Sequence, residues 1–243
     1  MSLLQIDNLW FRWPSGETAL RGVSLTLEEG RSLALVGRNG AGKSTLLLHL
    51  NGILHGNGAV RVRGKPVEDW PADELRATVG LVFEDPRDQL FMPAVIEDVT
   101  FGPLNFGVPG AEAREWALKV LASVGAEGLA HRAPHHLSAG QMRRVALATV
   151  LAMQPELLVV DEPAMALDPE GREAIIALLA GLSQAKIIAT HDLDLVLELC
   201  DTVAVMDDGR IHATGPAREI LSDETLLRAH GLRVPAKIAT SDG

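Results

Sequence analysis

The chain of 243 residues can bury the core of one large domain but is short for two independent ones. Its 22 Lys and Arg against 32 Asp and Glu give a formal net charge of −10, which excludes a general attraction to nucleic acid or to an anionic lipid surface. The single cysteine, Cys200, excludes an intrachain disulfide and is typical of a reducing compartment, and we expect neither a signal peptide nor a membrane-spanning helix.

Three early segments alternate between apolar and polar residues, which is typical of strands that have one covered and one exposed face. They are residues 3–9, 21–29 and 59–64. We expect them to form a small antiparallel layer beside a larger sheet.

Five further segments are apolar almost without interruption, which predicts strands that are covered on both faces. Helical patterns separate them along much of the chain, so the predicted fold class is α/β with a mainly parallel sheet. The five segments are residues 32–37, 79–83, 156–161, 186–190 and 202–206.

The first of these buried strands leads through the sequence LVGRNGAGKST (35–45) into a helical run. Gly37, Gly42, Lys43 and Ser44 fit the pattern G-x-x-x-x-G-K-[ST] in the strand-to-helix setting that the pattern needs. The glycines let backbone N–H groups cradle the β- and γ-phosphates, the lysine adds positive charge, and the serine hydroxyl can ligate Mg²⁺. A glycine-rich turn made only for sheet geometry would not explain the Lys-Ser pair. The pattern therefore predicts a nucleotide site.

No strand is predicted over residues 84–155, where helical patterns at 109–125 and 138–154 indicate a helical insertion between two halves of the sheet. The second helix starts with Ser138 three residues before Gln141, the spacing of a capping box. A helix start with small residues around it can also bind an anion through free backbone N–H groups. Capping and anion binding both stay open here.

Two carboxylates and a histidine follow later buried strands. The strand at 156–161 ends in Asp161 and Glu162, which cost desolvation energy unless a cation or a proton-transfer role compensates them. We expect Asp161 to support Mg²⁺ and Glu162 to be the general base toward the attacking water, the alternative being two solvated acids in a loop. His191 follows the next strand and should emerge at the same rim, near the γ-phosphate. Alone, such a histidine would more often cap a helix or belong to the core.

In this order the motifs resemble those of the ATP-binding subunits of ABC transporters, over essentially residues 3–218. GRNGAGKST resembles the Walker A loop and LLVVDEP (157–163) the Walker B strand. ALD (166–168) resembles the D-loop, His191 the switch histidine, and LSAGQ (137–141) the family signature. The resemblance implies a P-loop NTPase core with an antiparallel β layer and an inserted α-helical subdomain.

The family pattern divides the chain into parts of one ATPase domain, residues 1–243. The nucleotide-binding core is expected over 1–84 and 155–218, and the helical signature subdomain over 85–154. A short helical tail is expected over 219–243, from two short helical patterns and a polar end.

The resemblance also assigns site residues. It makes Glu162 and His191 catalytic, and it makes the metal ligands Ser44, Glu84 and Asp161. The cofactors are ATP and Mg²⁺, and the nucleotide contacts within one chain are Gly37, Asn39, Gly40, Gly42, Lys43, Ser44 and Thr45. Trp13 falls where the family places an aromatic that stacks on adenine. Packing within the antiparallel layer is the competing explanation for this tryptophan.

The signature implies that one chain does not hold a complete ATP site. In this family two subunits face head to tail, and the signature helix of one closes over the ATP held by the other. The resemblance therefore implies a homodimer with two composite ATP sites, in which contacts across the dimer come from Ser138, Gly140, Gln141 and Asp168. Asp168, followed by Pro169, is also a good helix N-cap, and the two roles are compatible.

Residues 79–109 are similar to those of energy-coupling-factor transporters, notably the cobalt-type CbiO ATPases. Four of the five phenylalanines lie between residues 83 and 106, and packing of the helical subdomain must claim some of them. Aromatics on a loop-rich segment also suit docking of a coupling helix from a membrane subunit.

The expected function is accordingly the ATPase motor of an importer for cobalt, at the cytoplasmic face of the membrane. Its expected partners are a second copy of itself, an integral membrane coupling subunit and a substrate-binding membrane subunit, with no nucleic acid. Nickel, biotin or another vitamin stays open as cargo.

Two functions of other classes compete with transport. A soluble ABC ATPase of DNA repair or translation typically has tandem modules or coiled-coil insertions and needs nucleic-acid contacts, for which only local basic positions such as Arg143 and Arg144 are available here. A P-loop kinase gives no reason for the sequence LSAGQ.

Two residues depart from the family pattern. Glu84 stands where a glutamine that ligates Mg²⁺ is expected, so it adds negative charge near phosphate. Ala139 replaces the first signature glycine, and its methyl group restricts the backbone. We expect a functional but slower ATPase.

Overall fold

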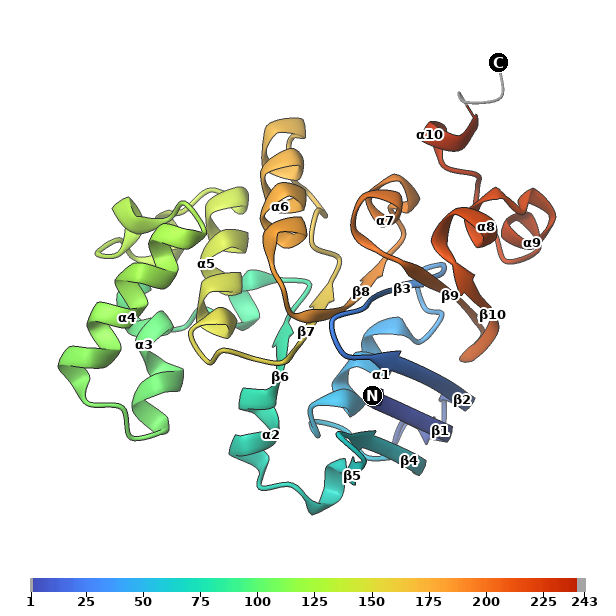
Figure 1. Cartoon of the computed structure of the whole chain (residues 1–243), viewed down its shortest axis with the longest axis horizontal. Helices are drawn as coiled ribbons and strands as arrows, with labels where there is room; N and C mark the ends of the chain where they lie inside the picture. Colours follow the sequence, from blue (N-terminus) through green and yellow to red (C-terminus); the bar gives the residue numbers. More distant parts are fainter. Residues whose placement is uncertain (1, 240–243) are drawn as a thin grey trace.

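The computed structural model describes residues 2–239, which form two sheets and the helices that pack on them (Figure 1). The larger sheet has six strands in the order β10-β9-β3-β8-β7-β6. Their bounds are β3 (Ser32–Val36), β6 (Val79–Val82), β7 (Leu157–Asp161), β8 (Ala185–Thr190), β9 (Thr202–Asp207) and β10 (Arg210–Pro216). The five predicted strands are all present and pair in parallel, so the loops after them meet at one rim.

The edge strand β10 was not predicted. It pairs with β9 in antiparallel fashion, and its residues alternate between partly buried and exposed. The sequence RIHATGP has few apolar residues, because only one face of this edge strand is covered.

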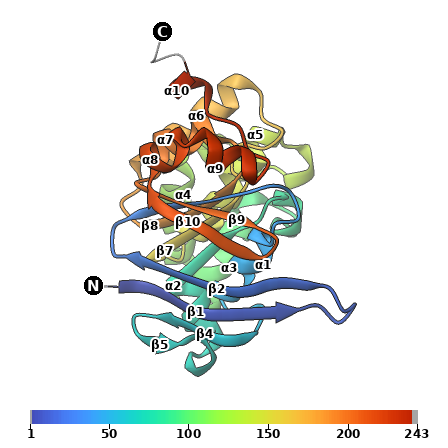
Figure 2. The same ribbon diagram turned by 90° about the vertical axis from the view of Figure 1, so that its right-hand side faces the viewer.

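The second sheet has the order β2-β1-β4-β5 and forms a separate layer below the larger one (Figure 2). Its strands are β1 (Ser2–Arg12), β2 (Thr18–Glu28), β4 (Asn57–Val62) and β5 (Lys65–Pro66). All of its pairings are antiparallel, which confirms the predicted layer. The helix α1 (Lys43–Leu50) lies between the layers, and its buried Leu46, Leu47 and Leu50 belong to the core cluster that both sheets share.

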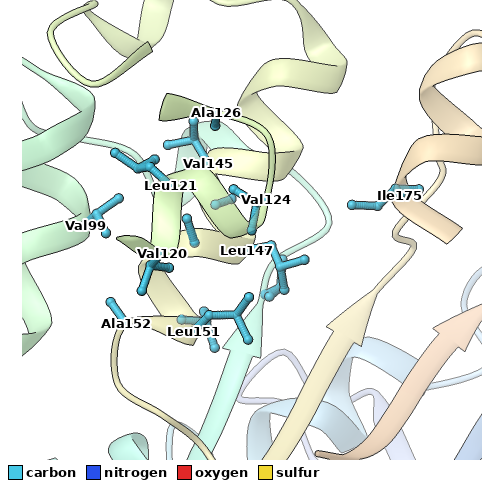
Figure 3. Close-up of a cluster of buried hydrophobic side chains, with 14 of the residues drawn as sticks. Val99, Val120, Leu121, Val124, Ala126, Val145, Leu147, Leu151, Ala152 and Ile175 are labelled. Carbon is cyan, nitrogen blue, oxygen red and sulfur yellow. The ribbon is translucent and has the colours of Figure 1, made fainter. Parts of the chain in front are cut away.

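A helical subdomain joins β6 to β7 and lies to one side of the sheets (Figure 1). It contains α3 (Val95–Asn105), α4 (Gly110–Ser123) and α5 (Ala139–Leu151), which pack through apolar side chains such as Val99, Leu121 and Leu147 (Figure 3). The two predicted helices correspond to α4 and α5. The interpretation of residues 79–109 as loop-rich was wrong, because residues 95–105 form α3 despite Pro103.

The remaining elements cover the larger sheet or connect strands. The helices are α2 (Ala72–Thr78), α6 (Pro169–Gly181), α7 (Leu193–Leu199), α8 (Ala217–Ser222), α9 (Glu224–Ala229) and α10 (Ala236–Ala239). Short 3₁₀ turns lie at η1 (Val67–Asp69), η2 (Pro86–Asp88), η3 (Glu127–Leu129) and η4 (Pro134–His136). The predicted helical tail is present as α8 to α10, and its last residues, 240–243, lie outside the described part. Between residues 2 and 239 no helix is long and apolar enough to cross a membrane.

Candidate functional site

Residues 37–44 comprise the tight turn between β3 and α1 and the first two residues of α1, and only glycine is permitted at two positions of this turn. A Cβ on Gly37 would collide with the backbone carbonyl oxygen of Met206. Gly42 has φ of +102°, and a Cβ there would lie 2.6 Å from the carbonyl oxygen of Ala19. Gly42 is also the N-cap of α1, so the first free N–H groups of that helix face the loop. We call residues 37–44 the phosphate loop.

Lys43 is buried and bends back over the phosphate loop. Its Nζ donates to the carbonyl oxygens of Gly37, at 2.9 Å, and Arg38, at 3.2 Å. The same nitrogen lies 3.9 Å from Oε1 of Glu162. The ammonium group is thus held between the loop and a buried carboxylate.

A cavity of about 480 Å³ lies beside this lysine. Most of the predicted nucleotide and metal residues line it: Trp13, Asn39, Gly40, Gly42, Lys43, Ser44, Thr45, Glu84, Asp161 and Glu162. The predicted convergence of strand ends is therefore present, and the cavity holds the positive charge of Lys43 close to the carboxylate of Glu162.

Trp13 lies in the turn between β1 and β2. Its backbone N–H donates to the carbonyl oxygen of Glu17 at 2.8 Å and closes this turn. Its ring packs edge-on against Phe11 with centroids 4.9 Å apart, and it also lines the cavity. Trp13 thus both packs on the antiparallel layer and lines the cavity, so the two explanations are compatible.

Asp161 is a buried carboxylate at the end of β7. It hydrogen-bonds with the Ser44 hydroxyl, and its Oδ1 is buried with no hydrogen-bond partner among residues 2–239. Burial is the largest cause that raises its pKa, the charges of Glu84 and Glu162 add to the shift, Ser44 and Lys43 oppose it, and the resulting pKa is about 6. A buried, unpartnered carboxylate oxygen beside a hydroxyl is an all-oxygen donor set of the kind that Mg²⁺ prefers.

The raised pKa of Asp161 predicts that stability without metal and nucleotide depends on pH. Since the pKa is higher in the folded protein than its ordinary 3.8, the folded state binds this proton more tightly, and stability falls as pH rises from about 4 to about 6. Asp161→Asn removes that penalty, so it should stabilise the metal-free protein at pH 8 by about 2 kcal/mol and have little effect at pH 4. Urea unfolding at both pH values checks this. Asp73→Asn, an exposed change on α2, is the control, and a destabilised Asp161→Asn at pH 8 would contradict the prediction.

Glu162 is held in a strained and highly specific position. Its φ is +43°, unusual for a non-glycine residue, and its N–H donates to the carbonyl oxygen of Ala189 at 2.8 Å. Oε2 accepts a hydrogen bond from Thr190 Oγ1 at 2.9 Å, and Oε1 lies 2.9 Å from Nδ1 of His191. The predicted His191 therefore emerges at the expected rim, where it contacts Glu162 directly. His191 and Lys43 thus both face Oε1 of this carboxylate, and Thr190 holds Oε2.

The capping box at the start of α5 is confirmed. The Ser138 hydroxyl accepts from the Gln141 N–H at 3.3 Å, and the Gln141 side chain accepts from the Ser138 N–H at 3.0 Å. Asp168 likewise caps α6, accepting from the Gly171 N–H at 2.9 Å. These residues line a cavity of about 420 Å³ together with Gly140, and none of them lines the cavity beside Lys43. Within one chain, the residues of the two halves of the predicted composite site thus line different cavities.

Arg143, expected as a local basic position, instead holds backbone at the edge of the site. It is buried, and its guanidinium donates to the carbonyl oxygens of Glu84, at 2.6 Å, and Phe83, at 3.2 Å. Burial lowers its pKa, and nearby carboxylates partly offset that shift. The helical period gave a usable signal, since Arg143 shares a helix face with the buried Leu147 and Val150. Through Arg143, α5 holds the backbone of Phe83 and Glu84 in the segment that follows β6, residues 83–89.

Gln89 fixes the other end of the segment 83–89. Its Oε1 accepts from the Phe83 N–H at 3.2 Å, and its Nε2 donates to Ala146 O and Thr149 Oγ1, both at 2.7 Å. Glu84 itself stays exposed, lining the cavity beside Lys43. The segment is thus fastened to α5 at two points, with its carboxylate free to face a ligand.

Comparison with known proteins places these features in a family. Residues 20–165 match the family described as ABC transporter. The energy-coupling factor transporter ATP-binding protein EcfA of Methanocaldococcus jannaschii is 46% identical over 241 residues, which cover 97% of this chain and 86% of that protein.

Solved structures agree in fold. The structure of cbiO1 from Clostridium perfringens, described as part of the ABC transporter complex cbiONQ, aligns with a TM-score of 0.82 at 37% identity and covers 100% of this chain and 99% of its own. A dimeric post-hydrolysis state of the ATP-binding cassette MJ0796, bound to ADP and Pi, aligns with a TM-score of 0.79 at 28% identity. That alignment covers 88% of this chain and 99% of the other.

Proposed function

This chain belongs to the ABC transporter family of ATP-hydrolysing subunits, and from that premise we propose that it is the motor of an energy-coupling-factor importer. The observation that carries the proposal is the buried carboxylate of Glu162 held between Lys43 and His191 at the mouth of the phosphate loop. That arrangement suits hydrolysis beyond nucleotide binding alone. The relatives named EcfA and cbiO1 support the energy-coupling-factor type.

The catalytic roles follow from the geometry of the rim. Glu162 accepts a proton from the attacking water as general base, and His191 orients Glu162 and meets the γ-phosphate. Ser44, Asp161 and Glu84 would hold Mg²⁺, which when bound neutralises charge on the phosphate oxygens. The nucleotide lies along Asn39, Gly40, Gly42, Lys43 and Thr45, with adenine on Trp13.

We further propose that two chains meet head to tail, so that Ser138, Gly140, Gln141 and Asp168 of one contact the nucleotide of the other. The separation of the two cavities within one chain supports this arrangement. The dimeric cassette with ADP and Pi shows that a chain of this fold assembles in pairs. In domain terms, residues 1–84 and 155–218 form the core, 85–154 the signature subdomain and 219–243 the tail.

The partner in the membrane would dock on the helical subdomain. Four large apolar side chains are exposed around α3: Phe91 (63%), Phe101 (42%), Leu104 (46%) and Phe106 (43%). Phe91 and Phe101 pack edge-on with centroids 5.2 Å apart, so they form one aromatic surface. An integral coupling subunit bound there, with a substrate-binding membrane subunit, would place the chain at the cytoplasmic face of the membrane.

Co-purification from a detergent extract tests the transporter assignment. We expect the chain to bring down hydrophobic subunits, and Phe91→Asp with Phe101→Asp to lose them while still binding ATP. Leu118→Asp, at an exposed apolar position on α4, is the matched control that should keep them. A chain found only in the soluble fraction, bound to RNA or DNA, would overturn transport in favour of a soluble ABC ATPase.

Cobalt is the cargo we propose, with nickel or a vitamin such as biotin as the alternative. The similarity of residues 79–109 to cobalt-type ATPases supports it, as does the neighbour cbiO1 from a cbiONQ complex. Uptake of labelled cobalt, nickel and biotin by cells that express the whole transporter separates these cargoes.

Glu84 and Ala139 should make this ATPase slower than one with the family's glutamine and glycine at these two positions. The negative charge of Glu84 raises the pKa of Asp161 and would lie near a bound phosphate, and Glu84→Gln removes that charge. We expect it to increase turnover about fivefold, since one screened charge is worth on the order of 1 kcal/mol. Ala139→Gly should give a smaller increase. Steady-state ATPase assays over a Mg²⁺ titration check both, with the exposed Glu97→Gln as control, and unchanged turnover in both variants would contradict the prediction.

A further inference from the structure

Three potential metal ligands converge near the nucleotide cavity, and none of the three lines it. Asp207 ends β9, His212 lies on β10, and His230 is the C-cap of α9. One ligand atom from each can be chosen so that all three lie within 4.8 Å of one another. Three separate elements thus bring two imidazoles and a carboxylate to one point.

Contacts around these residues already orient them. Asp207 Oδ1 accepts from the Asp208 N–H at 3.1 Å, which leaves Oδ2 directed at His230 Nδ1, 3.2 Å away. The rings of His212 and His230 lie 4.1 Å apart at an interplanar angle of 36°. His230 is partly buried, and its neighbours Leu227 and Leu232 belong to the apolar cluster between the larger sheet and the helices α7 to α9.

We propose that Asp207, His212 and His230 form a site for one divalent first-row transition-metal ion such as Zn²⁺ or Co²⁺. Two imidazole nitrogens and one carboxylate oxygen are a ligand set that such ions bind, with a fourth position left for water. Mg²⁺ and Ca²⁺ prefer oxygen ligands, so the site differs in chemistry from that of Asp161. A metal–ligand distance of about 2.1 Å requires a closer spacing of the ligand atoms than 4.8 Å, so the exposed His212, whose Nε2 contacts the Asp207 carbonyl oxygen at 3.2 Å, must move inward.

The ion would fasten the C-terminal helices to the phosphate loop. The hairpin between β9 and β10 contacts that loop, because the Gly209 N–H donates to the Ala41 carbonyl oxygen at 3.0 Å. On the other side, Gly231 packs so closely on Arg38 that a Cβ would lie 2.5 Å from Arg38 Cδ. A metal joining His230 to the hairpin therefore links two segments that flank the loop. The site is independent of the proposed transport function and of its cargo.

Metal titration of the full, tag-free chain tests the site. Excess Mg²⁺ is present to occupy oxygen ligands of the nucleotide site. We expect one Zn²⁺ per chain in competition with a chromophoric chelator, visible Co²⁺ absorption bands typical of nitrogen and oxygen ligands, and a higher melting temperature with Zn²⁺. His212→Gln and His230→Gln should each weaken Zn²⁺ binding by at least the roughly 10–100-fold that loss of an outer-shell partner costs.

His135→Gln with His136→Gln is the matched control. These two exposed histidines also lie ring to ring, with centroids 4.2 Å apart, but they belong to η4 far from Asp207 in the sequence. The control should bind Zn²⁺ as the wild type does. Absence of stoichiometric Zn²⁺ binding would overturn the proposal, and so would an unchanged affinity in His212→Gln, whose exposed position makes misfolding no explanation.

Discussion

Glu162→Gln should reduce ATP turnover by about 10²–10⁴-fold, the contribution typical of a general base, while ATP still binds. Glutamine has the shape of glutamate and can still accept from Thr190 Oγ1, but it cannot take a proton from water. The variant keeps Lys43 and the whole phosphate loop, so the loss should appear in the chemical step. Single-turnover assays with labelled ATP measure hydrolysis, and equilibrium binding of a fluorescent nucleotide measures affinity.

The control for this variant is Glu115→Gln, an exposed glutamate on α4 whose partner is Lys119. It should hydrolyse ATP at the wild-type rate. A Glu162→Gln rate within about twofold of wild type, far short of the loss that removal of a general base produces, would remove Glu162 from the mechanism.

Lys43→Ala should weaken the binding of the ATP phosphates, the step that comes before hydrolysis. The ammonium group is buried and positioned by two carbonyl oxygens, so its charge needs no reorganisation to meet an incoming phosphate. Its removal should cost about 3 kcal/mol of binding free energy, or about 100-fold in ATP affinity. It also leaves Glu162 without the cation that lies 3.9 Å away. Hydrolysis should then be too slow to measure at ordinary ATP concentrations.

Nucleotide anisotropy measures this loss, and Lys119→Ala is the matched control because that lysine is exposed on α4. Circular dichroism before each titration shows whether the variant is folded. A folded Lys43→Ala protein with wild-type ATP affinity would contradict the assignment of residues 37–44 as the phosphate loop.

The parallel sheet was predictable because burial on both faces leaves a continuous apolar pattern. β7, LLVVD, shows it clearly, and the same strand end exposes Asp161 and Glu162 to the rim. β10 escaped prediction because an edge strand carries no such pattern. α3 escaped it because Gly102 and Pro103 weaken the helical signal, whereas packing against α4 and α5 stabilises the helix in the folded chain.

Within the site, the sequence could predict residue types at strand ends but not the directions of their side chains. That His191 contacts Glu162 depends on the positive φ of Glu162 and on the bond from Thr190. Arg143 and Gln89 act through backbone carbonyls and amides, which sequence motifs do not describe. The cluster of Asp207, His212 and His230 arises only when α9 packs beside the hairpin.

The central claim is that each ATP site is completed by a second copy of the chain. Two inactive variants test it directly: Glu162→Gln removes the base, and Ser138→Arg blocks the signature that would meet the partner's nucleotide. When they are mixed, each heterodimer contains one site with an intact Glu162 from one chain and an intact Ser138 from the other.

The measurement is the ATPase rate of that mixture against the rates of the two variants alone. Random pairing makes about half of the dimers mixed, each with one of two sites complete, so about a quarter of the wild-type rate should return. A mixture no more active than the sum of its two components would contradict the composite site.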